Sequence, residues 1–326
     1  MILKPEEPLP VFVLSMQKIV VLPQDANQRL DKYLKKYFKE ASAGFLYKML
    51  RRKNIVLNGK KAEGQILLCA NDEITVYFSD ETFLKMRGGD VQKDTGREVS
   101  DPDQLDVIYE DKDICIVNKP SGILTQKSKP GDLCLNDMLL THCKAKGEVT
   151  EESLSLYKPS AMNRLDRNTS GIVLCAKTFA GAQYLSKVLK EKETVKDYHC
   201  ICRGVIRDEM ILEGYLKKDP KTNTVVIEEE PFPDAKYIKT GITPISFGND
   251  RTYLSVRLYP GRPHQIRVQL SHAGHPILGD YKYGTKESIQ KTEEEGIRSL
   301  CLTATELGFR HPATGKNMHL TCPEEQ

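Results

Sequence analysis

Residues 86–103 most constrain the fold of this 326-residue chain, because nothing in them suits a buried element. The segment contains hardly an apolar residue and is rich in residues that interrupt helices and strands. We interpret it as a linker, which agrees with a length prior of roughly 150 residues per domain. The sequence therefore predicts a small domain over residues 19–85 and a larger domain over residues 104–326.

The chain begins with a segment that fits neither domain. Residues 1–18 contain several prolines and no hydrophobic period, so we expect a flexible leader. They lack the basic start and sustained apolar stretch of a secretory signal, and no part of the chain approaches the ~20 consecutive apolar residues of a membrane span. We expect a cytoplasmic protein with no membrane association.

The nine cysteines are odd in number and include no CxxC pair, and most lie inside apolar runs. This usage favours buried free thiols over a disulfide framework or a metal site. His272 and His275, with His264 nearby, could be taken for metal ligands, but no carboxylate or cysteine completes an evident set. Histidines that shape a turn are the simpler interpretation, and we expect neither metal nor cofactor.

Basic residues are concentrated in the small domain. The segment between Gln28 and Glu63 has eleven basic and three acidic residues, a net charge of +8, whereas the whole chain has a net charge of only +3. A polyanion is the natural partner of such a segment.

Hydrophobic patterning within the small domain predicts a helix–helix–hairpin module. Leu30, Leu34 and Phe38 recur with helical spacing, and a second short helix is expected around Phe45–Leu50. A strand is expected at Ile55–Leu57, followed by Asn58–Gly59, which favours a type I′ hairpin turn, and a strand at Ile74–Phe78 would close the unit.

The sequence pattern of the larger domain predicts strands separated by turns, with few helices. This pattern predicts an α+β fold with a mixed or antiparallel sheet. Strands are expected at 106–109, 114–118, 172–176, 198–203, 236–243 and 252–259, and helices at 178–191 and 264–272.

The segment Asn163–Gly171 groups polar and charged side chains just before an apolar strand, where catalytic groups are often held. Asp166 is its only carboxylate, and we expect the flanking Arg164 and Arg167 to keep it ionised. An ionised carboxylate suits nucleophilic or general-base work. For an isolated aspartate, an Asx turn or a structural salt bridge is the competing interpretation.

This segment closely resembles the HRLDxxTSG motif of the RluA-type pseudouridine synthases, the family that includes the bacterial ribosomal RluC and RluD enzymes. Five further segments resemble other motifs of the family and occur in the same order. They are Ile116–Leu124 (family motif KPxG), Lys196–Tyr198 (KxY), Pro260–Leu270 (TGRTHQIRVHL), Gly274–Asp280 (GHPIxGD) and Leu307–Gly315 (LxFxHPxTG). The resemblance implies an α+β catalytic domain with a mixed or antiparallel sheet.

Residues 28–78 resemble an S4 RNA-binding domain, most specifically over Phe45–Ala62. This second resemblance implies a small N-terminal α/β domain whose ligand is RNA. The residues that it assigns to RNA binding are Arg29, Lys48, Arg51, Arg52, Lys53 and Lys60.

The family resemblance implies an isomerase that converts uridine to pseudouridine without cofactor or metal. Asp166 would be the essential aspartate, which either adds to the sugar or removes a sugar proton; the sequence does not distinguish these routes. Arg267 would pair with Asp166, and Tyr198 would stack on the uracil. Arg164 would enter the RNA helix when the base is flipped out.

Each of these roles has a structural alternative, because Tyr198 could be a core residue and Arg164 or Arg267 an ordinary ion-pairing cation. The sequence also departs from the family pattern: Asn163 and Gln269 replace histidines, and Pro263 replaces a threonine. Asn163 cannot titrate, which excludes a proton from that position.

Two classes of function follow. The first is a pseudouridine synthase, with large-subunit (23S) ribosomal RNA as the expected substrate and transfer RNA as an alternative. The second is a non-catalytic S4-type RNA-binding protein, which would have no need to retain Asp166, Tyr198 and Arg267 together. We expect a monomer with no obligate protein partner.

Overall fold

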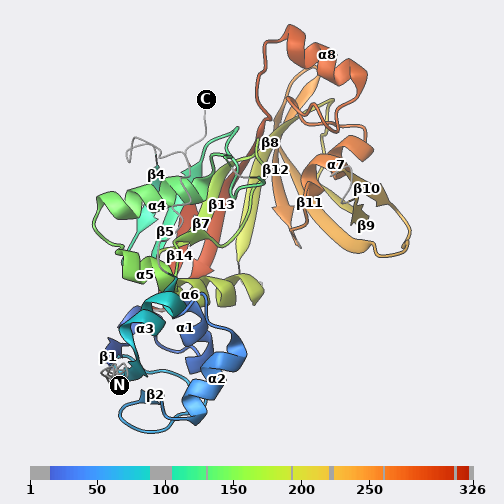
Figure 1. Ribbon diagram of the computed structural model, residues 1–326. Coiled ribbons are helices and arrows are strands. Elements are labelled where there is room, and N and C mark those ends of the chain that lie inside the picture. The colour runs from blue at the N-terminus through green and yellow to red at the C-terminus, as the bar shows by residue number, and fades with distance from the viewer. Residues whose placement is uncertain are drawn as a thin grey trace, which may run out of the picture. The chain divides into compact units, whose positions relative to one another are not determined.

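The computed structural model describes residues 15–88, 105–129, 131–191, 194–219, 224–259, 261–311 and 314–322, and it divides into two compact units (Figure 1). The first unit contains the described residues up to 88, together with 149–158 and 178–180. The second contains the other described residues. No helix in the described ranges is long and apolar enough to cross a membrane.

The first unit combines a three-stranded antiparallel sheet, in the order β1-β3-β2, with short helices. Its elements are β1 (Ser15–Val20), η1 (Pro23–Asp25), α1 (Leu30–Tyr37), α2 (Ala43–Arg51), β2 (Ile55–Leu57), β3 (Glu73–Phe78), α3 (Asp80–Arg87) and α5 (Glu151–Leu156). The predicted apolar stripe is confirmed, because Leu30, Leu34 and Phe38 are fully buried. The predicted type I′ turn is also confirmed, since Asn58 and Gly59 both have positive φ, at 49° and 71°.

The ends of this unit correct the predicted boundaries. Residues 15–18 were expected in the flexible leader but belong to β1, which pairs with β3 from Ser15 opposite Phe78 to Val20 opposite Glu73. The pairing with β3, which local composition does not reveal, orders this part. Helix α3 likewise extends into the predicted linker as far as Arg87. Residues 1–14 of the predicted leader and 89–103 of the predicted linker lie outside the described residues.

The segment 149–158 was expected in the larger domain, but it groups with the first unit. It contains α5, whose Leu156 is buried in the same apolar core as Leu34 and Phe38. This contact joins residues far apart in sequence, so the periodicity of neither segment indicates it.

The second unit is built on an eleven-stranded sheet with the order β10-β9-β11-β12-β8-β13-β7-β5-β4, to which β14 and β6 add beside β13 and β7. The pair β13–β7 is parallel, whereas the other pairs are antiparallel. The predicted α+β class with a mixed sheet is therefore confirmed.

The strands of this unit are β4 (Asp106–Glu110), β5 (Ile114–Lys119), β6 (Ser160–Ala161), β7 (Ser170–Ala176), β8 (Val195–Arg203), β9 (Met210–Lys218), β10 (Val225–Glu228), β11 (Lys236–Phe247), β12 (Arg251–Leu258), β13 (Leu302–Arg310) and β14 (Asn317–Thr321). The helices are α4 (Leu135–Ala145), α6 (Phe179–Lys190), α7 (Gln265–His272) and α8 (Lys286–Glu294). Helix α7 confirms the predicted helix after Pro263.

The two faces of the β8–β12–β11–β9 part of the sheet differ. Helix α7 packs on one face, where Leu254 and Val256 of β12 meet Ile266 and Leu270 in a buried apolar cluster. Tyr198 of β8 packs against the same cluster. Because successive side chains of a strand point to opposite faces, Asp197 and Arg257 lie on the other face.

A glycine marks the point where β7 meets β13. Gly171 has a φ of 108°, and a Cβ atom at this position would lie 2.3 Å from the carbonyl oxygen of Ala304. Only glycine allows this backbone contact beside the Asp166 segment.

Gly171→Ala is expected to lower the free energy of unfolding by about 3 kcal/mol or more, because a methyl group would overlap the backbone of β13. Gly147 is the matched control: its φ is also positive, at 69°, but a Cβ atom at this position would have no neighbouring atom within 4 Å. Gly147→Ala should therefore lose only about 1–2 kcal/mol. Denaturant unfolding measures both, and equal losses would contradict the steric explanation.

Candidate active site

Asp166 lies in the loop between β6 and β7, and hydrogen bonds fix this loop on both sides of it. Thr125 Oγ1 donates to the carbonyl of Leu165 at 3.0 Å and accepts from the Leu165 amide at 3.2 Å. Asn163 Oδ1 accepts from the amide of Leu174 in β7 at 2.7 Å. The Asp166 side chain itself is 25% exposed. The loop thus presents a partly accessible carboxylate on a fixed backbone.

The bond made by Asn163 explains the departure from the family motif. The side chain at this position accepts a hydrogen bond from a backbone amide of β7, which an amide oxygen does without titrating. The substitution of the usual histidine is therefore compatible with a fixed Asp166 loop.

The side chain of Lys119, the last residue of β5, binds a backbone carbonyl of the same loop. Its side chain is fully buried, and its Nζ donates to the carbonyls of Pro120, Ile123 and Arg167 at 2.9, 2.8 and 3.0 Å. Burial lowers the pKa of Lys119 to about 8, while the charge of Asp166 acts to raise it. At neutral pH the ammonium group keeps the three donors that match these three carbonyls.

Arg267 of α7 supplies the cation that pairs with Asp166. Its Nη1 donates to Asp166 Oδ2 at 3.0 Å, across 101 residues of sequence. Its Nε and Nη2 donate to the two carboxylate oxygens of Asp280, each at 2.8 Å. Although burial acts to lower it, the hydrogen bonds and charge of Asp280 raise the pKa of Arg267, so the guanidinium is a permanent cation. The expected pairing of Arg267 with Asp166 is thus present in the geometry.

His264, which precedes α7 with a φ of 58°, is a neighbour of Asp166 that the sequence reasoning did not assign to catalysis. Its Nδ1 lies 3.7 Å from Asp166 Oδ2 and accepts a hydrogen bond from Arg267 Nη1 at 3.2 Å. Burial and the charge of Arg267 lower the pKa of His264. The ring is therefore neutral at physiological pH and carries its proton on Nε2.

The aromatic ring of Tyr283 lies beside the guanidinium of Arg267. The guanidinium carbon lies 5.1 Å from the centre of the Tyr283 ring, and the His264 ring meets it edge-on at 5.5 Å. Burial raises the pKa of Tyr283 to about 12, so its hydroxyl stays protonated. Asp280, His264 and Tyr283 were not predicted as site residues, although Asp280 belongs to the GHPIxGD-like motif and His264 to the segment containing Arg267.

Tyr198 lies on the α7 side of the sheet and is half-buried against the apolar cluster around Cys200 and Cys202. Burial, with a smaller contribution from the charge of Asp166, raises the pKa of Tyr198 to about 12. Its phenol is consequently neutral, and the residue as a whole is partly exposed.

The expected role of the flanking arginines is corrected by the structure. Arg164 and Arg167 are exposed, and within the described ranges Asp166 forms its ion pair with Arg267. Neighbours in a tight loop point in different directions, so sequence proximity did not identify the partner. The exposed side chain of Arg164 is accessible to a ligand.

The basic residues predicted to bind RNA are exposed on the first unit: Arg29 directly precedes α1, and the others lie at α2 and the turns that follow it. They differ in availability. Arg29 forms a two-point ion pair with Asp31, which also accepts a hydrogen bond from Tyr47. The side chains of the other predicted residues are also exposed: Lys48, Arg51, Arg52, Lys53 and Lys60.

One group in the described ranges has the donor types of a metal site: Glu110, Cys115 and His142. Lys146 and Lys177 already donate to Glu110, and although burial acts in the opposite direction, these bonds lower its pKa to about 2. Two cations on the one carboxylate oppose metal binding, so we interpret the group as an ion-pair cluster.

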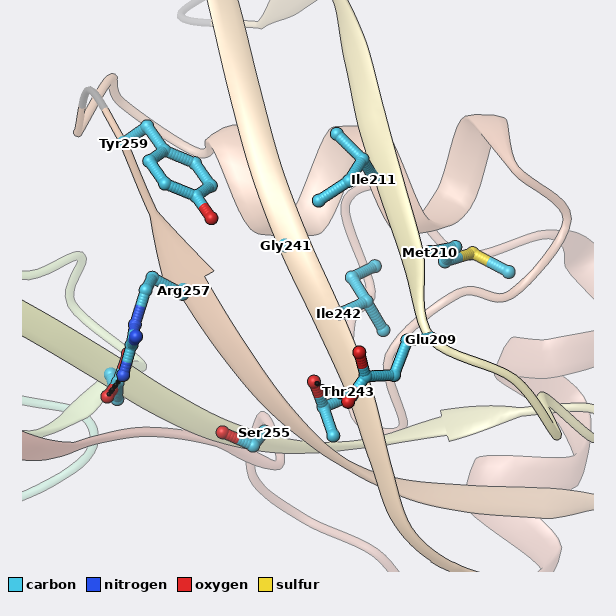
Figure 2. Close-up of a pocket in the computed structure, with 10 residues that line it drawn as sticks. Glu209, Met210, Ile211, Gly241, Ile242, Thr243, Ser255, Arg257 and Tyr259 are labelled. Carbon is cyan, nitrogen blue, oxygen red and sulfur yellow. Dashed lines mark hydrogen bonds and ion pairs between the residues drawn. The ribbon is translucent and has the colours of Figure 1, made fainter.

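A hollow of about 460 Å³ lies on the sheet face opposite α7 (Figure 2). Figure 2 shows Arg257 and Tyr259 along one wall, Ile211 and Glu209 along the other, and Gly241 between them. Asp166, Tyr198 and Arg267 do not line it. The hollow is thus separate from the candidate active site.

Comparison with known proteins agrees with this geometry. A family profile described as RNA pseudouridylate synthase matches residues 113–272, which include Asp166, Tyr198 and Arg267. An uncharacterised RNA pseudouridine synthase of Mycoplasma genitalium is 32% identical over 307 residues, covering 93% of this chain and 92% of that protein. This chain belongs to the RNA pseudouridine synthases. It is therefore an isomerase that acts on RNA.

The ribosomal large subunit pseudouridine synthase C of Buchnera aphidicola is 29% identical, covering 94% of this chain and 93% of that protein. The match supports the RluA-type family. Among solved structures, human RNA pseudouridylate synthase domain containing 1 covers 69% of this chain and 85% of its own, with a TM-score of 0.55 and 22% identity. That likeness shows the fold of the synthase.

The burial of Lys119 predicts a pH-dependent stability. Its pKa is about 8 in the folded synthase but ~10.4 in an unfolded chain, so the unfolded chain binds the proton more strongly between these values. The contribution of Lys119 to the free energy of unfolding should therefore increase by about 1–2 kcal/mol from pH 7.5 to 9.5.

The measurement compares denaturant unfolding of the native synthase and Lys119→Met at both pH values. The native protein should gain stability relative to the variant as the pH rises. A difference that is constant with pH would show that Lys119 has its ordinary pKa in the fold.

Proposed function

We propose that this synthase converts uridines of large-subunit ribosomal RNA to pseudouridine, with Asp166 as the group that acts on the sugar. The observation that carries the role of Asp166 is its position: a partly exposed carboxylate on a fixed loop, bonded to one N–H of a buried arginine. Such an anion is accessible to a ribose, and the positive charge that pairs with it comes from α7 instead of its own loop.

The reaction conserves every atom of the nucleotide. The C1′–N1 bond breaks, a bond from C5 to C1′ forms, and the proton lost from C5 is balanced by one taken up at N1. Asp166 either adds an oxygen to C1′ as the uracil leaves or removes a sugar proton to give a glycal. Both routes use a carboxylate anion close to the ribose, and the charge of Arg267 stabilises the anion when it is released.

The target uridine has to leave the base stack, because its glycosidic bond is inaccessible inside a duplex. Tyr198, neutral and half-buried beside the site, suits stacking on the flipped uracil and proton exchange as a phenol. Arg164, exposed on the Asp166 loop, suits the space that the base leaves. These two roles complete the proposed site.

The basic first unit supports RNA binding through phosphates. We propose that it acts as an S4-type RNA-binding domain, with Lys48, Arg51, Arg52, Lys53 and Lys60 as its contacts and a lesser part for the paired Arg29. The relatives named for the ribosomal large subunit favour ribosomal RNA over transfer RNA as the substrate. A cytoplasmic location agrees with such a substrate, and we expect a monomer.

Asp166→Asn is expected to abolish conversion of uridine while RNA binding survives, because the amide is nearly the same size but is neither an anion nor a base. RNA labelled with tritium at uridine C5 provides the assay, since tritium reaches water only when C5 is substituted. Asp234→Asn, at an exposed position, is the matched control. Continued tritium release by Asp166→Asn would show that another group does the chemistry.

Replacing Arg51, Arg52 and Lys53 together with alanine is expected to weaken RNA binding to a similar degree across RNA sequences. The slope of log K against log salt should fall by roughly 2–3, since each phosphate contact contributes about 0.7–0.9. Salt titrations of binding measure this slope. A variant lacking Lys286, Lys291 and Arg298 removes equal charge from the second unit, and an equal effect there would contradict a specific role for the basic first unit.

A further inference from the structure

Asp280 controls how Arg267 can meet Asp166. Both carboxylate oxygens of Asp280 are used on the guanidinium: Oδ2 accepts from Nε and Oδ1 from Nη2, each at 2.8 Å. The two side chains are buried, at 1% exposure for Asp280 and 9% for Arg267. A two-point pair of this kind fixes the plane of the guanidinium as well as its position.

The carboxylate of Asp280 is itself held in place. Its Oδ1 also accepts from the backbone amides of Lys282 and Tyr283, at 3.0 and 3.1 Å. The preceding Gly279 has a φ of 78°, and a Cβ there would lie 1.9 Å from the carbonyl oxygen of Ser299. The turn therefore has little freedom to move Asp280 away from Arg267.

A guanidinium held in this way has one N–H edge blocked and offers Nη1 to Asp166. Within the described ranges, Nη1 donates to Asp166 Oδ2, at 3.0 Å, and to His264 Nδ1, at 3.2 Å. Among the described residues no hydrogen bond is made to Asp166 Oδ1. A mobile arginine would instead form the two-point fork that it prefers with a carboxylate, and would occupy both oxygens of Asp166.

The charges of Asp166, Arg267 and Asp280 support the same conclusion. One guanidinium charge is shared between two carboxylates, so the group formed by Asp166, Arg267 and Asp280 keeps a net charge of −1 when both acids are ionised. Although burial acts to raise it, the hydrogen bonds and charge of Arg267 lower the pKa of Asp280, which keeps that carboxylate ionised. Arg267 thus orients Asp166 without neutralising the group.

We propose that Asp280 is a positioning residue for the isomerisation: it restricts Arg267 to a one-point contact, which leaves one oxygen of Asp166 available to the sugar. The proposal rests on the proposed role of Asp166 as the group that acts on the ribose. It assigns Asp280 no contact with the RNA.

Asp280→Asn is a sharp test, because an asparagine that keeps its oxygen in the Oδ1 position retains the bonds to Lys282, Tyr283 and Arg267 Nη2. It loses the bond to Nε and the charge. We expect kcat for tritium release to fall about 100-fold with KM for RNA unchanged, since a small misplacement of a reacting group has this order of effect. Asp280→Glu restores the charge but displaces it, and should also have a lowered kcat.

A double-mutant cycle shows whether Asp280 acts through Arg267. In an Arg267→Lys background the fork is absent, so adding Asp280→Asn should cause little further loss of kcat. Independent losses that multiply would overturn the proposal, as would full kcat in Asp280→Asn or a loss confined to KM.

Glu295→Gln is the matched control, because it removes the carboxylate from another buried guanidinium, that of Arg203, at a contact of 2.8 Å outside the site. It should change the melting temperature but not kcat, and an equal fall in kcat would overturn the proposal. The role of Asp166 is judged separately: if Asp166→Asn stays active, that role fails, whereas an inactive Asp166→Asn with a fully active Asp280→Asn refutes only the positioning by Asp280.

Discussion

The buried guanidinium of Arg267 is the interaction on which the catalytic unit depends. It joins a loop before β7 to the turn that follows α7, and it does so through two carboxylates that lie 101 and 13 residues away in sequence. Removing one partner of a buried ion pair leaves an uncompensated charge, which typically destabilises a protein by about 3–5 kcal/mol. The same contact therefore contributes to the fold and to the chemistry, and the two contributions separate only when kinetics and stability are measured together.

The site combines a rigid anion with neutral neighbours. Lys119 and Thr125 fix the backbone on either side of Asp166, so the carboxylate is positioned by the main chain as well as by its own contacts. His264 and Tyr198 are uncharged at neutral pH because burial disfavours their charged forms. In such surroundings Arg267 supplies the cation that pairs with Asp166, which suits a reaction in which the charge of Asp166 is used and then restored.

Local patterns in the sequence were informative where the structure is determined locally. The stripe of Leu30, Leu34 and Phe38 and the Asn58–Gly59 turn follow from helical spacing and from backbone preference. The motif around Asp166 identified the loop, and the resemblance named Arg267 as its partner. The arginines next to Asp166 in sequence were a wrong guide to its environment, because side-chain direction in a tight loop is set by hydrogen bonds to distant strands.

Long-range pairing accounts for what the sequence did not predict. Strand β13 lies in the middle of the sheet, yet it contains Thr303, Ala304 and Gly308 in place of a clear apolar alternation. Small residues suit that position because Gly171 of β7 approaches the backbone of Ala304. Asp280 was overlooked for a similar reason: its importance lies in the geometry of a third residue, which neither its own motif nor its neighbours indicate.

The place of β13 has a consequence for how the synthase is made. Residues 302–310 are inserted between β8 and the start of β7, so these two earlier-made strand edges have no partner there until β13 has left the ribosome. Unpaired strand edges are prone to pair with other chains, which makes this interval the one in which the nascent protein most needs protection. The loop that carries Asp166 directly precedes β7, so we expect the active geometry to form only after β13 has been synthesised.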